Sequence, residues 1–244
     1  LGLSTGIITS RGLDFSCDGL LKGISIAGSV SPQTTTFCNS YYQGKRKQII
    51  SDVANRIKKE QIPKGWDKAK IVHICPVADE VDQEIFTIFK DSLVGLTPQG
   101  LMRRWDEKGQ VYSKKWMPIL KVCSRVDVLI FSEEDIADFP EVLEEYKSLI
   151  NIVILTRGAE GSILYWRGKE FIFSAFKTEE KDPTGAGDVF AAAFLIKYYQ
   201  TDDPIESSRF ANCIASFAVE GKGTAGIPDF DRLIKRASLM GIDL

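Results

Sequence analysis

The residues best suited to chemistry in this chain are 182–188, which read DPTGAGD and precede an apolar stretch at 189–199. The apolar stretch predicts a buried helix. Unpaired backbone donors would then point out of its N-terminus, namely the N–H groups of Gly185, Ala186 and Gly187. Together with the helix dipole, such donors favour an anion. Asp188, in the first turn, would stay ionised and accept a proton from a hydroxyl group, so the stretch predicts phosphoryl transfer. The alternative is a glycine-rich helix start in which the glycines only permit tight packing and Asp188 only complements the dipole.

Short apolar runs separated by helical stretches surround this candidate site. The expected strands are 6–9, 71–74, 93–96, 128–131 and 152–155. The expected helices are 51–59, 142–149, 189–199, 204–219 and 229–237. Continuous apolar strands that alternate with helices predict an α/β fold with a mainly parallel sheet. Ligands of such sheets bind beyond the carboxyl ends of the strands.

One segment has a different pattern. Residues 34–42 alternate in polarity, Gln43-Gly44 form a turn signal, and 45–50 continue as a second strand. The pattern predicts a β-hairpin with polar faces. It is either a flap over a ligand site or an edge hairpin with a solvated basic tip.

Composition excludes several classes of protein. The chain has 244 residues, 44% of them hydrophobic and 26% charged, with a net charge of −2. This balance is typical of a soluble globular domain and gives no sign of nucleic-acid binding. Five cysteines without a CxxC pair predict free thiols in a reducing compartment, so we expect a cytoplasmic protein. No apolar run is long enough to span a membrane.

The segment DPTGAGDVF resembles the second signature of the ribokinase-like (PfkB) carbohydrate kinase family. The resemblance implies a three-layer ribokinase-like fold over 1–244, with a mainly parallel central sheet and 34–50 as a small β-hairpin lid. It also implies an ATP-dependent kinase that uses Mg²⁺ and, in some members, K⁺, and a homodimer formed through the lid. The family's opening strand, with its substrate-binding Asp and Gly-Gly signature, is not found in this chain.

Further motifs extend the resemblance over nearly the whole chain. Residues 153–161 look like the family's strand and T-x-G-x-x-G turn at the ATP phosphates, and 221–226 look like its C-terminal loop. The implied nucleotide-binding residues are Thr156, Gly158, Gly161, Asn212 and Gly223. Asp182 and Thr184 would hold a monovalent cation.

Two segments depart from the family pattern or leave their role open. The family's N-x-x-E motif, which organises Mg²⁺ through water, is replaced by Ser132 and Asp135 at its two ends. These residues either still organise Mg²⁺ or only cap a helix. The run Q-G-x-x-R at 99–103 is similar to a segment of the inositol-kinase-like branch, in which Gln99 would bind a polyol and Arg103 would face phosphate. The alternative is a loop in which Arg103 and Arg104 are solvated.

The leading hypothesis is therefore an ATP-dependent kinase for a sugar or polyol, with Asn39 of the lid, Gln99 and Arg103 as substrate residues. One alternative is a nucleoside kinase, since one fold serves both substrate classes. Another is a catalytically silent relative that acts as a binding or regulatory protein. No Walker motif is present, which argues against an unrelated P-loop kinase. His73, inside an apolar run, is interpreted as a core histidine.

Overall fold

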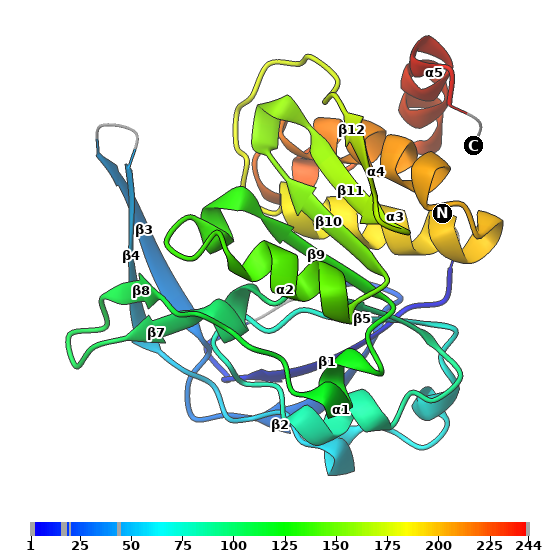
Figure 1. Cartoon of the computed structure of the whole chain (residues 1–244). Coiled ribbons are helices and arrows are strands. Elements are labelled where there is room, and N and C mark those ends of the chain that lie inside the picture. The colour runs from blue at the N-terminus through cyan, green and yellow to red at the C-terminus, as the bar shows by residue number, and fades with distance from the viewer. Residues whose placement is uncertain (1–2, 16–18, 20, 43–44, 243–244) are drawn as a thin grey trace. The chain divides into compact units, whose positions relative to one another are not determined.

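The structure is a computed structural model that describes residues 3–15, 19, 21–42 and 45–242 (Figure 1). The chain divides into two compact units. Unit 1 comprises Leu1–Ala69, Pro76–Asp91 and Gln99–Met117. Unit 2 comprises Lys70–Cys75, Ser92–Pro98 and Pro118–Leu244, and contains the DPTGAGD segment.

Unit 2 is built on a six-stranded sheet with the order β12-β11-β10-β9-β6-β5. Its strands are β5 (Ile71–Ile74), β6 (Leu93–Leu96), β9 (Val128–Ser132), β10 (Ile152–Thr156), β11 (Ser162–Trp166) and β12 (Lys169–Phe173). The first four are parallel to one another, and β11 and β12 add an antiparallel hairpin. The sheet is therefore mainly parallel, as the sequence predicts.

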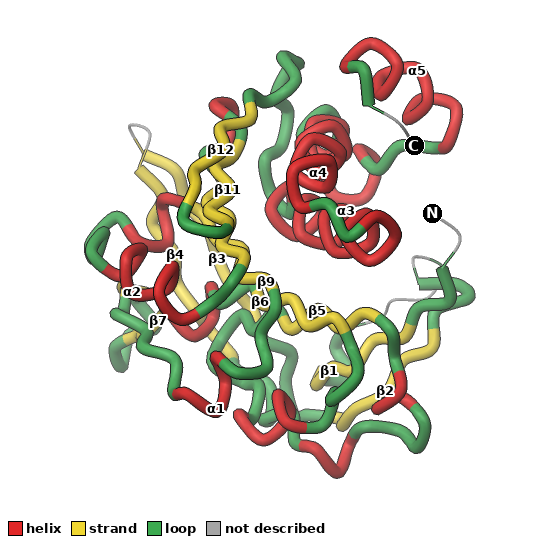
Figure 2. The backbone as a smooth tube through the Cα atoms, turned by 45° about the vertical axis from the view of Figure 1, so that its right-hand side comes forward, coloured by secondary structure: helices red, strands yellow, loops and turns green. Residues whose placement is uncertain are grey.

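The apolar runs of the sequence form the centre of this sheet because helices cover both of its faces. In β9 and β10 every residue is buried except the last. Helices α3 (Ala186–Thr201) and α4 (Pro204–Ala218) lie side by side on one face, and α2 (Val142–Leu149) lies on the other (Figure 2). Gly95 lets α3 approach β6, since a Cβ there would lie 2.4 Å from Cδ1 of Leu195. The result is the predicted three-layer α/β arrangement.

Two further helices complete unit 2. The four-residue α1 (Leu120–Cys123) precedes β9, and α5 (Phe230–Met240) packs on α4 through the buried Leu233 and Ala237.

Unit 1 contains three two-stranded sheets. Their strands are β1 (Gly6–Arg11) with β2 (Ser25–Val30), β3 (Thr36–Tyr42) with β4 (Lys45–Asp52), and β7 (Arg103–Trp105) with β8 (Val111–Ser113). The β3–β4 pair is the predicted hairpin, and its turn at 43–44 lies outside the described residues. The hairpin forms a sheet of its own, and β8 packs beside β4 (Figure 1).

Short 3₁₀ helices connect the longer elements. They are η1 (Lys59–Gln61), η2 (Trp66–Lys68), η3 (Gln83–Thr87), η4 (Gln99–Met102), η5 (Glu133–Ile136), η6 (Gly158–Glu160) and η7 (Gly223–Gly226).

Two expectations about elements were wrong. The helix predicted at 51–59 is absent: β4 extends to Asp52, and the chain then runs irregularly until η1. Ile57 instead forms a bridge with Val81, so pairing with distant residues overrides the local helical pattern. The run at 6–9 does form a strand, but β1 pairs in parallel with β2 and is not part of the six-stranded sheet.

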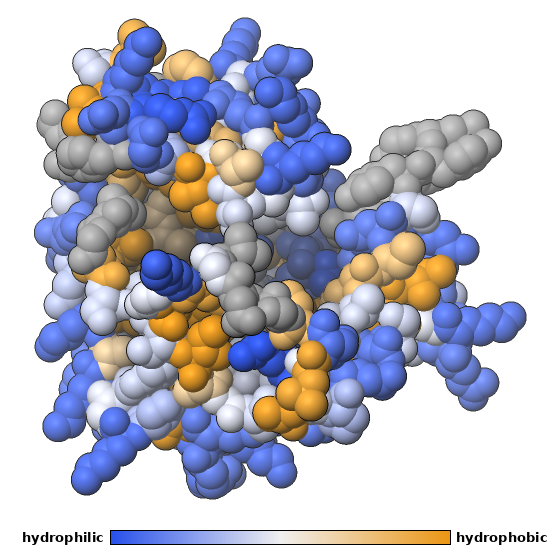
Figure 3. Space-filling model, turned by 180° about the vertical axis from the view of Figure 1, so that it is seen from behind, coloured by the Kyte–Doolittle hydropathy of each residue, from blue (hydrophilic) through white to orange (hydrophobic). Residues whose placement is uncertain are grey.

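The surface is mostly hydrophilic on the face shown in Figure 3, as the ordinary balance of charged and hydrophobic residues in the composition predicts. Figure 3 also shows smaller groups of apolar side chains between the hydrophilic ones. Among the described residues, no helix has the length and apolar character that crossing a membrane requires. The four described cysteines are free thiols; Cys123 and Cys213 are buried, whereas Cys38 and Cys75 are exposed.

Candidate active site

The DPTGAGD segment leads into the first turn of α3. Gly185 is the N-cap residue and has φ 83°, a left-handed conformation that favours glycine. A Cβ at Gly185 or at Gly187 would meet no atom within 4 Å, so the backbone on this side is open to a ligand. Asp188 lies in the first turn and is exposed. The local sequence therefore places a carboxylate and an open backbone together at a helix N-terminus, where the dipole favours an anion.

One of the three predicted backbone donors is already engaged. The N–H group of Ala186 donates to the carbonyl oxygen of Pro183 over 3.2 Å, which closes the turn before α3. The expectation that all three N–H groups would be unpaired is therefore wrong for Ala186. The glycine at 185, whose carbonyl accepts from Val189 over 3.0 Å, marks the start of the helical hydrogen-bond ladder.

Asp182 connects the start of this segment with the predicted C-terminal loop. Its Oδ1 accepts the N–H of Thr184 over 3.0 Å, and its Oδ2 accepts the N–H of Gly223 over 3.4 Å. Hydrogen bonds from the side chain and N–H of Thr184, and from Gly223, lower the pKa of Asp182. The structure thus brings together three residues that the sequence assigned to the nucleotide or cation site.

The turn after β10 is the second glycine-rich element. Thr156 ends β10 and donates its hydroxyl to the Phe131 carbonyl over 3.3 Å. Gly158 has φ 52° and no atom within 4 Å of a Cβ position, whereas a Cβ at Gly161 would lie 2.0 Å from the Phe173 carbonyl oxygen. Gly161 is therefore required for packing against β12, and Gly158 leaves the turn accessible.

Asn212 is a buried residue of α4 that faces the other end of this turn. Its Nδ2 donates to Ser162 Oγ over 2.8 Å and to the Ser208 carbonyl over 2.9 Å. It also lines a cavity of about 520 Å³, together with Phe173, Ile205 and the exposed Arg209. This volume lies within the range of about 300–1,000 Å³ that small-molecule pockets occupy.

The candidate Mg²⁺ residues form the helix cap that the sequence offered as the alternative. Ser132 Oγ accepts the N–H of Asp135, and Asp135 Oδ2 accepts the N–H of Ser132 over 2.9 Å, a capping box at the start of η5. The Ser132 hydroxyl also donates to Oδ2 over 2.8 Å. Mg²⁺ usually keeps several waters and binds one or two carboxylates plus phosphate oxygens. A single carboxylate whose Oδ2 already accepts two hydrogen bonds fits contact through water better than direct ligation.

The predicted substrate residues all belong to unit 1. Asn39, on β3, accepts a hydrogen bond from Gln48 Nε2 across the hairpin over 2.8 Å. Arg103 donates to the Val77 carbonyl over 3.3 Å, and its guanidinium lies 5.1 Å from the centre of the Phe37 ring. Gln99 begins η4 and is half-buried. Arg103 is therefore not the freely solvated side chain of the alternative interpretation, because it packs on the hairpin within unit 1.

Sequence reasoning missed two features of unit 2. One is the cavity beside Asn212, which could not be predicted because its walls come from three separate segments: β12, α4 and the chain near Ile242. The other is Glu220, which binds side chains from two distant segments. No motif marks either feature, although a carboxylate directly before a glycine-rich loop was a usable signal.

Comparison with known proteins identifies the family. The chain belongs to the pfkB family carbohydrate kinases, which match residues 60–229. A nucleoside kinase from Methanocaldococcus jannaschii is 28% identical over 131 residues, 51% of this chain and 43% of that protein. A cytidine kinase from Thermococcus kodakarensis is 26% identical over 211 residues, 81% of this chain and 74% of that protein. The matches thus span less than half the length of the first relative and about three quarters of the second.

Solved structures support the fold. A pyrophosphate-dependent kinase in the ribokinase family, solved as a sulfate complex, has a TM-score of 0.80 at 19% identity, over 96% of this chain and 86% of that chain. The fold is therefore ribokinase-like, as the sequence predicted.

Proposed function

We propose that this chain acts as an ATP-dependent kinase that phosphorylates a hydroxyl group of a sugar or polyol. The observation that carries the proposal is the exposed Asp188 in the first turn of α3, three residues after the left-handed N-cap Gly185, whose Cβ position is open. This pairs a carboxylate with an anion-favouring helix N-terminus.

In the proposed reaction, the acceptor oxygen attacks the γ-phosphorus of ATP while its proton passes to the Asp188 carboxylate. The bond between the γ-phosphorus and the bridging oxygen breaks, and ADP leaves with that oxygen. Backbone N–H groups at the start of α3 stabilise the charge on the transferred phosphoryl oxygens. General base help contributes a factor of about 10²–10⁴, and positioning contributes the rest.

The nucleotide is proposed to lie along unit 2. The open turn at Gly158 and the loop at Gly223 suit the phosphates, and the cavity beside Asn212 suits a base, with Phe173 and Ile205 as apolar walls. Mg²⁺ bound to the phosphates would neutralise their charge and would contact Asp135 through water. Asp182 and Thr184 are proposed to hold a monovalent cation such as K⁺.

The second part of the proposal concerns the chemical class of the acceptor. Relatives among the matches are named as nucleoside kinases, deoxyribokinases and inositol 3-kinases. A polyhydroxylated acceptor is favoured by the polar groups of unit 1, namely Asn39, Gln99 and Arg103. The protein is proposed to act in the cytoplasm on a small molecule, with the lid hairpin as the contact of a homodimer. A nucleoside kinase is the second candidate, because its acceptor is also a sugar hydroxyl.

The test is Asp188→Asn, assayed with ATP and with pyrophosphate against a panel of sugars, inositols and nucleosides. Asn keeps the size of the side chain but cannot take the proton, so turnover should fall by about 10²–10⁴, or roughly 3–5 kcal/mol of barrier. Nucleotide affinity, measured by calorimetry, should be kept.

Asp231→Asn is the matched control, since Asp231 is an exposed acid in the first turn of α5. It should cost about 0.3–1 kcal/mol of stability and leave turnover unchanged. If Asp188→Asn behaves like this control, Asp188 is not the base. If the wild-type chain binds ATP but transfers phosphate to none of the acceptors, it would instead be a catalytically silent family member.

A further inference from the structure

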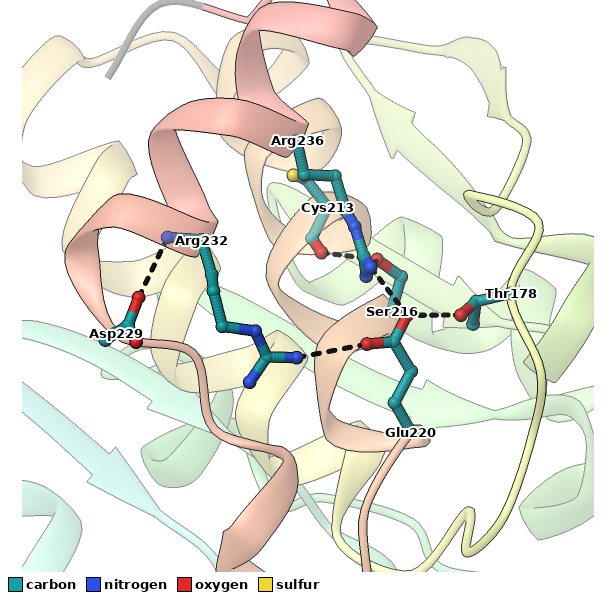
Figure 4. Close-up of polar contacts among 7 residues, drawn as sticks. All are labelled: Thr178, Cys213, Ser216, Glu220, Asp229, Arg232 and Arg236. Atoms are coloured by element: carbon teal, nitrogen blue, oxygen red, sulfur yellow. Dashed lines mark hydrogen bonds and ion pairs between the residues drawn. The ribbon is translucent and has the colours of Figure 1, made fainter.

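A half-buried cluster of charged and polar side chains lies beside the proposed nucleotide site, at the C-terminal end of α4 (Figure 4). Its centre is Glu220, whose side chain is 22% exposed. Glu220 Oε1 accepts hydrogen bonds from Thr178 Oγ1 and from Arg236 Nη2, the latter over 2.5 Å. Its Oε2 accepts a hydrogen bond from Arg232 Nη2 over 3.2 Å. We call Thr178, Glu220, Arg232 and Arg236 the Glu220 clamp.

On its α5 side, Arg236 makes further contacts that anchor the clamp. Arg236 also donates to Ser216 Oγ over 2.9 Å, and its guanidinium lies 3.6 Å from the centre of the Phe217 ring and 4.6 Å from that of Phe176. Burial acts to raise the pKa of Glu220, but hydrogen bonds from Thr178 and Arg236 and the arginine charges outweigh it and lower the pKa. The carboxylate is therefore held ionised as the common acceptor of the cluster.

The other side of the clamp is a segment without regular structure. Residues 174–180 join β12 to the DPTGAGD segment and form no helix or strand. Thr178 anchors this segment to Glu220. Just beyond, the N–H groups of Lys181 and Asp182 both donate to the Val219 carbonyl, over 2.7 and 3.2 Å. Asp182 in turn accepts the N–H of Gly223.

These contacts connect the same two stretches of chain at three places. Residues 178–182 run along 219–223, and the Thr178–Glu220 bond holds the end of this pairing that is farther from α3. A partly buried charged acceptor strengthens such a bond, because breaking the bond would leave the carboxylate without one of its donors. The position of 178–182 then fixes how the chain enters Gly185 and the first turn of α3.

We propose that Glu220 is a positioning residue for phosphoryl-donor binding, acting through Thr178 on the 178–182 segment and through Val219 on the loop at Gly223. The inference rests on the proposed kinase function of this site. Glu220 need not touch the donor; it sets the spacing between the loop at Gly223 and the segment that leads into the first turn of α3, where the donor phosphates are proposed to bind.

The test is Thr178→Val, which removes the hydroxyl donor, keeps the shape of the side chain and leaves both arginines on Glu220. We expect the KM for the phosphoryl donor, and its calorimetric dissociation constant, to rise about tenfold, while the KM for the acceptor stays the same. Hydrogen exchange should become faster at the amides of Lys181 and Asp182. Thr178→Ser keeps the hydroxyl and should restore wild-type values.

Thr201→Val is the matched control. The Thr201 hydroxyl donates to the Lys197 carbonyl over 2.9 Å at the far end of α3, about 20 Å along the helix from Asp188. Its loss should lower stability without changing donor affinity. A purely structural role of the clamp predicts the same outcome for Thr178→Val: a lower melting temperature with an unchanged donor KM and dissociation constant.

Donor affinity unchanged in Thr178→Val, or changed equally in Thr201→Val, would overturn the proposal. Calorimetry and hydrogen exchange do not depend on phosphoryl transfer, so they test the role of the Glu220 clamp separately from the proposed kinase activity. A wild-type chain that binds ATP and transfers no phosphate would reject the kinase, whereas the affinity difference between the two threonine variants would still decide the role of the clamp.

Discussion

Two glycines in one turn should respond very differently to the same substitution. Gly161 has φ 97° and ψ −128°, a region that residues with a side chain rarely adopt. A Cβ there would lie 2.0 Å from the Phe173 carbonyl oxygen and 2.6 Å from the Ala175 nitrogen. Gly158, with φ 52°, has no atom within 4 Å of its Cβ position. Backbone conformation therefore opposes both substitutions, but only Gly161→Ala also collides with backbone atoms.

The magnitudes follow from these contacts. Gly158→Ala should cost about 1–2 kcal/mol, the price of a left-handed conformation for an L-residue. Gly161→Ala should cost more than about 3 kcal/mol, because the strain of about 1–3 kcal/mol is added to the overlap with Phe173 and Ala175. Such a loss is a large fraction of the roughly 5–15 kcal/mol that stabilises a domain.

Denaturant unfolding of both variants measures the difference, as midpoint shifts at an equal slope. Calorimetry with ATP then separates stability from binding: Gly158→Ala should fold and bind ATP more weakly, since the proposed phosphate position meets the added methyl group. Equal stabilities of the two variants would refute the packing assigned to Gly161. Unchanged ATP affinity in Gly158→Ala would place the phosphates away from this turn.

Two further predictions concern stability. Burial lowers the pKa of His73 to about 4, from about 6.5 when unfolded, so the unfolded chain binds the extra proton between these values. Stability should therefore fall as the pH drops from 6.5 to 4, by up to about 1.4 kcal/mol per pH unit, and His73→Gln should remove this part of the slope; parallel pH curves would contradict it. Asp203 caps α4 by accepting the N–H groups of Ile205 and Glu206 over 2.8 and 3.1 Å. Asp203→Ala should cost about 1 kcal/mol in thermal unfolding and Asp203→Asn much less, whereas equal losses would argue against the cap.

The local hydrophobic pattern correctly predicted the strands and helices in which that pattern is clear. The runs at 71–74 and 93–96 and the helix at 142–149 have these bounds in the structure, because continuous apolar residues and a 3.6-residue period leave few alternatives. The prediction at 51–59 was wrong because β4 pairs with β3 and Ile57 pairs with Val81. The hydrophobic period of a short segment does not show which distant residues it will pair with.

In the candidate site, too, some features followed from the local sequence and others depended on tertiary contacts. Residues 182–188 predicted a helix N-terminus with Asp188 in its first turn, and the structure has one, in which Asp188 is exposed and the Ala186 donor is engaged. The sequence did not show which polar side chains would already be hydrogen-bonded to other residues of the chain. Asp135 bonds back to Ser132 within its capping box, and Asn39 pairs with Gln48, because polar groups bond to the partners that folding brings near.

By itself, the sequence determined the class of this protein: DPTGAGDVF before an apolar helix, and apolar runs between helices, specify a ribokinase-like α/β fold with a carboxylate at a helix N-terminus. Only the tertiary structure decided that β1 and β2 form a two-stranded sheet of their own, and that Glu220 joins Thr178 to Arg236. Thr178 and Arg236 lie 42 and 16 residues from Glu220 along the chain. Contacts over such separations depend on how whole elements pack, since a hydrogen bond acts only over about 3 Å and the local pattern does not encode which distant groups come within that reach.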